Sequence, residues 1–206
     1  DERKVVGTAY KQESRENAIK IGLDYFGPRM RQIVEDVENL GSKTILVHCW
    51  RGGMRSGAIA WLLDLYGFEV YSLTGGYKAY RNWVINQFET SSVFKILGGY
   101  TGSAKTDLLS QLNKDDLAVV DLEALANHKG SALGGIGQKP QPSQEMFENL
   151  LANKLHKNTN AEYIWMEDES QRIGNVQIPN ALWNQMKEST VYFLDIPFEQ
   201  RLDYLT

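Results

Sequence analysis

The single cysteine of the 206-residue chain lies where a thiol is readily ionised. Cys49 follows a short β-branched run at 44–47, and a helical pattern begins at Ser56. The backbone N–H groups of the intervening turn and the dipole of the helix both favour a thiolate there. The sequence therefore predicts a nucleophilic sulfur that faces an oxyanion or a chalcogen. The alternative is that Cys49 is a small core residue, as a lone cysteine at a strand end commonly is.

The residues that follow this cysteine suit an anion. Gly52 and Gly53 let the turn curl until its N–H groups converge, and the planar guanidinium of Arg55 can reach the same anion. The Cys-to-Arg spacing occurs in tyrosine-phosphatase loops and in rhodanese-like domains, and spacing alone does not choose between them. A phosphatase also needs an Asp general acid, and no upstream Asp has an obvious claim. The expected oxyanion loop comprises Trp50, Arg51, Gly52, Gly53, Met54 and Arg55.

A second Gly-rich segment has the form of a phosphate-binding loop. A strand pattern leads into a turn and then a helix, and the turn is a Walker A motif in which Ala104 replaces the second glycine. Its N–H groups would cradle a diphosphate, Lys105 would reach the outer oxygens, and Thr106 would ligate Mg²⁺. A structural turn without a ligand is the alternative, and the Cβ of Ala104 is expected to crowd the loop or alter its affinity. The expected diphosphate-binding residues are Gly99, Tyr100, Thr101, Gly102, Ser103, Ala104, Lys105 and Thr106.

Several other ionisable residues follow strand patterns in the second half of the chain. Asp121 ends an apolar run and is a second candidate metal ligand, and Glu123 lies on the same side of an extended chain. Glu167 opens an acidic cluster after another strand pattern, with Arg172 beyond it. In a P-loop domain such a cluster holds a metal or positions water, and the alternative is a solvated loop. His128 is a further candidate to face a ligand.

The elements that must position these residues alternate between the two regular patterns. Alternating strands and helices predict an α/β fold with parallel sheets and helices on both faces. One cycle closes before 87–92 and another opens after it, so we expect domains at 1–90 and 91–206. The Gly- and Pro-containing segment 129–142 reads as a functional loop. The predicted strands are 44–47, 68–73, 93–97, 117–120, 163–166 and 191–196, and the predicted helices are 18–40 with a break at Gly27-Pro28, 56–66 ended by Gly67, 77–88, 105–112 and 143–155 with Ser143 as N-cap.

Composition narrows the class of protein. Hydrophobic residues at 42% and charged residues at 23% are close to globular averages, which excludes disorder, a collagen-like repeat and a disulfide scaffold. No apolar run is long enough for a membrane span, and a single cysteine favours a reducing cytoplasm. The net charge of −4, with the excess of acid in the second half, argues mildly against an RNA partner. The chain opens without Met and closes inside a helical pattern, so we expect an internal fragment.

The two loops in combination closely resemble those of the bacterial tRNA 2-selenouridine synthases. This family joins a rhodanese-like domain to a P-loop domain, normally with an earlier strand and a longer C-terminal part, and usually with Gly at the position of Ala104. The resemblance therefore implies a rhodanese-like parallel-sheet domain, N-terminally truncated, followed by a P-loop NTPase-like α/β domain, C-terminally truncated. The matching stretches are 6–12, 49–56, 75–81, 100–106, 121–123 through Gly130-Ser131, 141–144, 147–149 and 167–174.

The resemblance also implies an activity and its co-substrates. In this family the wobble 2-thiouridine of tRNA is S-geranylated with geranyl diphosphate, and selenium from selenophosphate then replaces the geranylthio group. The resemblance suggests that the loop around Lys105 takes the diphosphate, that Cys49 accepts or handles selenium, and that Arg51 and Arg55 hold the selenophosphate oxyanion. A selenophosphate-supplying enzyme is a further expected partner. The alternatives are a sulfurtransferase or phosphatase fused to an NTPase, and a non-enzymatic binding module beside an inactive P-loop.

Overall fold

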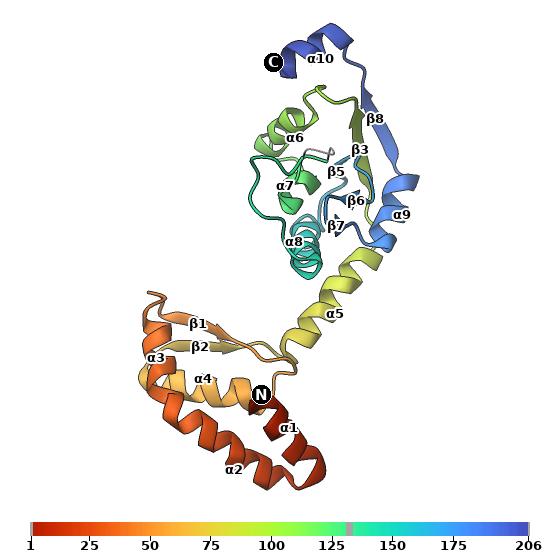
Figure 1. Cartoon of the computed structure of the whole chain (residues 1–206). Coiled ribbons are helices and arrows are strands. Elements are labelled where there is room, and N and C mark those ends of the chain that lie inside the picture. Colours follow the sequence, from red (N-terminus) through yellow and green to blue (C-terminus); the bar gives the residue numbers. More distant parts are fainter. Residues whose placement is uncertain (1, 131–133, 206) are drawn as a thin grey trace. The chain divides into compact units, whose positions relative to one another are not determined.

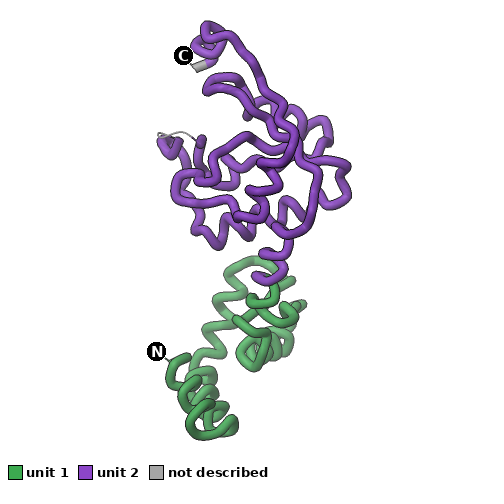
Figure 2. Tube along the Cα trace, turned by 90° about the vertical axis from the view of Figure 1, so that its right-hand side faces the viewer, with its two compact units in different colours: residues 1–80 green, residues 81–206 purple. Residues whose placement is uncertain are grey.

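The protein consists of two compact units, which are coloured separately in Figure 2. The structure, a computed structural model, describes residues 2–130 and 134–205; Ser131, which belongs to one of the matching stretches, lies outside them. The division between the units falls between Tyr80 and Arg81, inside helix α5 (Gly76–Glu89). The expected domain boundary after residue 90 lies ten residues later and stays a prediction. No helix in the described part of the chain combines the length and the apolar character that crossing a membrane requires.

The first unit contains a small parallel sheet. Strand β1 pairs with β2 in register from Thr44 opposite Glu69 to Val47 opposite Ser72. Only alternate residues of β1, Ile45 and Val47, are buried, so the strand presents one face to the core. The core around them consists of Val34, Leu62, Leu63 and Phe68. The elements, shown in Figure 1, are α1 (Glu2–Gln12), α2 (Arg15–Phe26), η1 (Gly27–Arg29), α3 (Met30–Glu38), β1 (Thr44–Val47), α4 (Met54–Tyr66) and β2 (Glu69–Ser72).

The helices of this unit confirm the break predicted at Gly27-Pro28 and the helix end predicted at Gly67. The predicted break at Gly27-Pro28 is the 3₁₀ turn η1 between α2 and α3. Gly67 ends α4 in the left-handed region at φ 108°, where its N–H donates to the carbonyl groups of Leu63 and Asp64. Helix α1 was not among the predicted elements, because its apolar residues are few and only Ala9 is buried.

The second unit is built on a four-stranded parallel sheet with the order β4-β5-β3-β8. This arrangement confirms the predicted α/β class with parallel sheets. Strand β3 is central and extends to Gly99, two residues beyond its predicted end, where it pairs with Leu194. The elements are β3 (Phe94–Gly99), α6 (Lys105–Lys114), β4 (Val119–Val120), α7 (Leu122–Ala126), α8 (Gln144–Lys157), β5 (Ile164–Glu167), β6 (Arg172–Ile173), β7 (Val176–Gln177), α9 (Asn180–Glu188), β8 (Thr190–Leu194) and α10 (Phe198–Leu205).

Helix α8 packs against α7, β4 and β7 in this unit. Its predicted N-cap is confirmed, because the Ser143 hydroxyl accepts a hydrogen bond from the N–H of Met146 at 3.2 Å. Phe147 and Leu151 on α8 are fully buried. The sequence patterns did not reveal the two-residue strands β6 and β7, which pair antiparallel, because so short a run carries no periodicity.

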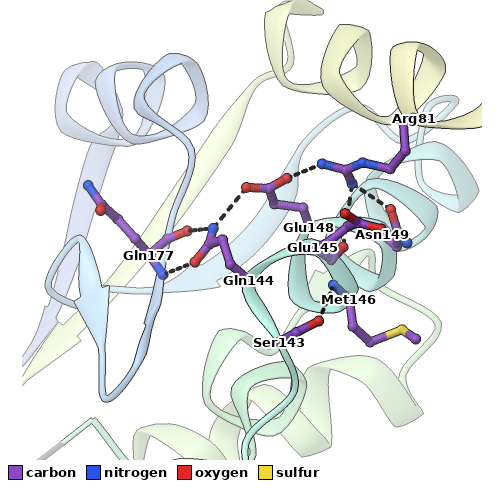
Figure 3. A network of polar contacts seen from close by, with 8 residues as sticks. All are labelled: Arg81, Ser143, Gln144, Glu145, Met146, Glu148, Asn149 and Gln177. Atoms are coloured by element: carbon purple, nitrogen blue, oxygen red, sulfur yellow. Dashed lines mark hydrogen bonds and ion pairs between the residues drawn. The ribbon is translucent and has the colours of Figure 1, made fainter. Parts of the chain in front are cut away.

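A polar network links Arg81, the first residue of the second unit on α5, to α8 (Figure 3). The guanidinium of Arg81 forms an ion pair with Glu148, and its Nη1 donates to Asn149 Oδ1 at 2.5 Å. The Gln144 side chain continues the network by donating to Glu148 and to the carbonyl of Gln177, each at 2.8 Å, and by accepting from the N–H of Gln177. Arg81, the first residue of the second unit, is thus joined to α8 by side-chain contacts.

Candidate functional site

The Cys49 loop connects β1 to α4 and surrounds a partly exposed sulfur. The N–H of Gly53 donates to Cys49 Sγ at 3.3 Å, and the Ser56 hydroxyl oxygen also lies 3.3 Å from the sulfur. The same hydroxyl lies 3.0 Å from the carbonyl oxygen of Gly53, and its single hydrogen goes either to that oxygen or, when Cys49 is ionised, to the sulfur. The sulfur is therefore held at the N-terminus of α4, beside donors that favour its ionised form.

The pKa of Cys49 reflects two opposing influences. Partial burial by itself raises the pKa, because it disfavours the charged thiolate. Hydrogen bonds from the Ser56 side chain and from backbone N–H groups, including those of Gly53 and Arg51, outweigh burial and lower the pKa to about 6. A thiol with this pKa is mostly ionised at neutral pH, so Cys49 can act as a nucleophile without a separate base.

The loop owes its curl to a close backbone approach. Gly52 and Gly76 both have positive φ, at 65° and 66°, and a Cβ on Gly52 would lie 2.6 Å from the backbone nitrogen of Gly76. The N–H of Tyr77 donates to the carbonyl of Cys49, and that of Lys78 donates to the carbonyl of Trp50, each at 2.9 Å. The first turn of α5 therefore uses its otherwise unpaired N–H groups to hold the cysteine loop.

The remaining loop side chains are open to solvent. Arg51 and Arg55 are exposed, and within residues 2–130 and 134–205 neither guanidinium forms an ion pair. Trp50 and Met54 are also about half exposed, at 50% and 53%. Both arginines are thus available to an anion that approaches the sulfur from outside.

The predicted phosphate loop lies between β3 and α6. Lys105 Nζ donates to the carbonyl of Gly99 at 2.8 Å, so the lysine folds back over its own loop. Ser103 is buried and its hydroxyl has no hydrogen-bond partner among the described residues. Ala104, immediately before α6, has left-handed dihedral angles of φ 58° and ψ 30°. A glycine would adopt this conformation without strain, whereas the Cβ of an alanine lies too close to the backbone there and strains it.

A cavity of about 620 Å³ opens beside this loop and gathers most of the candidates of the second unit. Of the eight predicted diphosphate-binding residues, six line it. Gly99 and Tyr100 do not, and the Tyr100 ring packs edge-to-face against Phe193 with the Arg201 guanidinium over it. The residues lining the cavity are Thr101, Gly102, Ser103, Ala104, Lys105, Thr106, Asp107, Asp121, Glu123, Ala124, His128, Lys129, Gly130, Gln138, Glu169 and Tyr204.

Two carboxyl groups lie together in the cavity wall. The pKa of Glu169 is raised to about 7, first by burial and then by the nearby Glu123 carboxylate. Burial and the charge of Asp121 raise the pKa of Glu123 as well. Thr106 Oγ1 lies 3.5 Å from Glu123 Oε2, which links the pair to the phosphate loop. A Cβ on Gly130 would lie 2.8 Å from Glu123 Oε1, so the chain passes directly over the carboxyl groups.

Hydrogen bonds to backbone groups are made by three other candidate residues of the second unit, Asp121, Glu167 and Arg172. Asp121 lines the cavity, but its Oδ1 also caps α7 by accepting from the N–H of Ala124 at 2.7 Å. Glu167 is fully buried and does not line the cavity, and its carboxyl group accepts a hydrogen bond from the N–H of Leu122 at 2.8 Å. Burial, followed by the charge of Asp121, raises its pKa to about 9. Arg172 is exposed and its Nε donates to the carbonyl of Gly174 at 3.0 Å.

Sequence reasoning missed two residues of these sites. Ser56 was not among the candidates, although a hydroxyl one helical turn beyond Gly53 can return to the cysteine. Glu169 lies in the acidic cluster that Glu167 opens, and nothing in its spacing relates it to Glu123.

The donors around the phosphate loop suit a hard cation. Within the described ranges, no three His, Cys, Asp or Glu side chains gather as a complete metal site. The Thr106 hydroxyl and the Asp121 and Glu123 carboxyl groups nevertheless all face one cavity. Oxygen donors of this kind, few in number and beside the predicted phosphate loop, fit Mg²⁺, which usually retains waters and takes its remaining ligands from phosphate.

Comparison with known proteins gives matches along nearly the whole chain. Residues 92–206 match the family model described as the tRNA 2-selenouridine synthase AAA domain, and residues 7–82 match that of the rhodanese-like domain. The tRNA 2-selenouridine synthase of Nitrosomonas europaea is 36% identical, over 98% of this chain and 54% of the relative. Those of Shewanella denitrificans and a Sulfurovum species are 38% and 36% identical, over 99% and 98% of this chain and 56% and 57% of the relatives. The chain thus spans a little over half the length of these relatives.

Proposed function

The chain belongs to the tRNA 2-selenouridine synthase family, and from this membership we propose that it is part of a transferase that converts the wobble 2-thiouridine of tRNA to 2-selenouridine. The proposed route has two steps. The thiouridine sulfur first takes the geranyl group of geranyl diphosphate, and selenium derived from selenophosphate then replaces the geranylthio group. An enzyme that supplies selenophosphate is the second proposed partner, beside the tRNA.

The selenium step is assigned to the first unit. The observation that carries the proposal is the Cys49 sulfur, which is held by the Gly53 N–H and the Ser56 hydroxyl and has a pKa of about 6. The exposed guanidinium groups of Arg51 and Arg55 supply the positive charge for a selenophosphate oxyanion. In the proposed step the Cys49 thiolate, the form of cysteine that reacts, attacks the phosphorus of selenophosphate, and the P–Se bond breaks with release of selenide. Selenide then displaces the geranylthio group from the base as geranylthiolate, and water frees Cys49 by releasing phosphate.

The diphosphate step is assigned to the second unit. The unpartnered Ser103 hydroxyl and the turn N–H groups offer hydrogen bonds to diphosphate oxygens, and Lys105 offers a positive charge. When geranyl leaves, negative charge develops on the departing diphosphate, and these groups stabilise it. A bound Mg²⁺, held by Thr106 and Asp121 with Glu123 alongside, would neutralise part of the same charge.

The proposal is tested by incubating the protein with thiolated tRNA, geranyl diphosphate and selenophosphate and analysing the nucleosides by mass spectrometry. Cys49→Ser is expected to stop selenium incorporation while S-geranyl-2-thiouridine still forms. Lys105→Ala is expected to stop geranyl transfer, and it loses this step before it loses the selenium step. Lys114→Ala, an exposed position on the same helix outside the cavity, serves as the matched control. If both substitutions abolish both steps equally in folded protein, the division between the two units is wrong.

A further inference from the structure

A cluster of aromatic side chains is formed by residues of the cysteine loop and of helix α5 in the first unit. The Tyr77 ring centroid lies 5.7 Å from that of His48 and 6.0 Å from that of Trp50, and 5.8 Å from that of Tyr80. His48 and Trp50 flank Cys49 in sequence, whereas Tyr77 and Tyr80 lie one turn apart on α5. We call these four rings the aromatic platform.

The backbone holds the aromatic platform in place relative to Cys49. Tyr77 donates its N–H to the carbonyl of Cys49, and Lys78 donates to that of Trp50, each at 2.9 Å. Because Gly52 and Gly76 have no Cβ, the two segments approach to a distance that no other residue pair would allow. The rings are therefore presented by a rigid junction rather than by a free loop.

The platform is accessible and is flanked by positive charge. Trp50 is 50% exposed, so a large part of its indole is open to a partner. Arg51, Arg55 and Lys78 are exposed nearby in sequence, and no acidic residue occurs in 48–63 or in 70–80. Aromatic faces that stack bases, together with basic side chains that contact phosphates, are the features of a surface for single-stranded nucleic acid.

We propose that the aromatic platform receives an unstacked nucleobase of single-stranded RNA, stacking it on Trp50 beside Cys49, while Lys78 contacts the adjacent phosphate and Arg51 and Arg55 remain with the selenophosphate oxyanion. This inference rests on the proposed function, in which the base that reacts is the wobble 2-thiouridine. Enzymes that act on an atom of a base take that base out of its stack, and bases in RNA loops are the ones that proteins splay onto aromatic side chains. The platform gives the base a place within reach of the sulfur.

The test is to measure the affinity of the full chain for two RNA stem–loops by fluorescence anisotropy at one fixed salt concentration. One carries 2-thiouridine at the wobble position of an anticodon loop, and the other is abasic there. Wild type is expected to bind the first more tightly. Trp50→Leu is expected to weaken binding of the thiouridine loop by roughly 5- to 100-fold and to leave the abasic loop unchanged. Trp50→Phe, which keeps a ring, is expected to retain most of the affinity.

Trp61→Leu is the matched control, because Trp61 is 56% exposed on α4 and outside the platform. It should leave both affinities unchanged. The rate at which Cys49 is alkylated reports whether the loop is intact in each variant. If Trp50→Leu alters that rate, Tyr80→Leu replaces it as the test of the platform.

The proposal is overturned if wild type binds both stem–loops equally or binds neither, or if Trp50→Leu weakens both to the same extent. Failure of the proposed function gives a different pattern. In that case wild type forms no 2-selenouridine, although its binding still depends on the base and on Trp50.

Discussion

The hydroxyl oxygen of Ser56 lies 3.3 Å from the sulfur of Cys49, and this contact is one of the hydrogen bonds that lower the pKa of the thiol to about 6. Ser56 is buried on the first turn of α4, so its hydroxyl stays directed at the loop rather than at solvent. The helix thus contributes a side-chain donor in addition to its dipole.

Ser56→Ala is expected to raise the pKa of Cys49 toward the ordinary thiol value of about 8.5. Since only the thiolate reacts, the alkylation rate of wild type rises with pH through about 6 and then levels off. The variant should rise at higher pH. The measurement is the rate of reaction with iodoacetamide as a function of pH. Ser72→Ala, at an exposed position in the same unit, should keep the wild-type profile, and an unchanged midpoint in Ser56→Ala would refute the role of the hydroxyl.

Gly76→Ala is expected to disrupt the cysteine loop. The new Cβ would collide with the backbone of Gly52 and with the carbonyl of Cys49, at a residue whose φ is 66°. Backbone overlap together with left-handed strain should cost about 2–4 kcal/mol in the free energy of unfolding of the first unit. Denaturant unfolding measures this cost, and the alkylation midpoint of Cys49 should rise at the same time.

Gly41→Ala separates strain from collision. Gly41 has nearly the same φ, 68°, but no atom lies within 4 Å of its added Cβ. This variant should lose only about 1–2 kcal/mol and keep the reactivity of Cys49. Equal losses in the two variants would show that the close approach of the two segments is unimportant.

Ala104→Gly is expected to stabilise the second unit by about 0.5–1 kcal/mol. The relief of left-handed strain at φ 58° exceeds the extra chain entropy that glycine adds to the unfolded state. The same exchange at Ala124, which is exposed within α7, should instead destabilise the unit by about 0.5–1 kcal/mol. Denaturant midpoints compare the two variants. A loss of stability in Ala104→Gly would mean that the Cβ of Ala104 makes packing contacts worth more than the strain.

Glu167→Gln tests the buried carboxyl group. The folded-state pKa of about 9 lies above the unfolded value of about 4.3, so the stability from the protonated form is complete below the lower value and is lost as pH rises through the upper one. Between these values the free energy of unfolding should fall by up to about 1.4 kcal/mol per pH unit. The amide cannot ionise, can still accept from Leu122, and should flatten this dependence.

The measurement for Glu167→Gln is denaturant unfolding of the second unit from about pH 5 to about pH 9. Glu162→Gln, at an exposed position on the same unit, is the control and should follow wild type. Parallel curves for Glu167→Gln and wild type would show that Glu167 is already ionised in the folded protein.

The chain order of strands and helices was largely predictable, because each periodic pattern is local. The strands at 44–47 and 93–97, the helix end at Gly67 and the cap at Ser143 all appear where the residue types indicate. Elements too short to show a period, such as β6 and β7, were not predictable. Helix α9 was not predictable either, because only Leu182 and Met186 of its residues are buried and two positions show too little of a period.

The sequence by itself determined the chemistry available to this protein. Cys49 before a helix, and Lys105 after a glycine-rich turn, are recognisable because a few adjacent residues set the backbone geometry of each loop. Only the tertiary structure decided which distant residues complete these loops. It brings Gly76 and Tyr77 against the cysteine loop and Glu169 beside Glu123. Such contacts arise from packing between segments that are far apart along the chain, and packing leaves no regular spacing in the sequence from which it could be inferred.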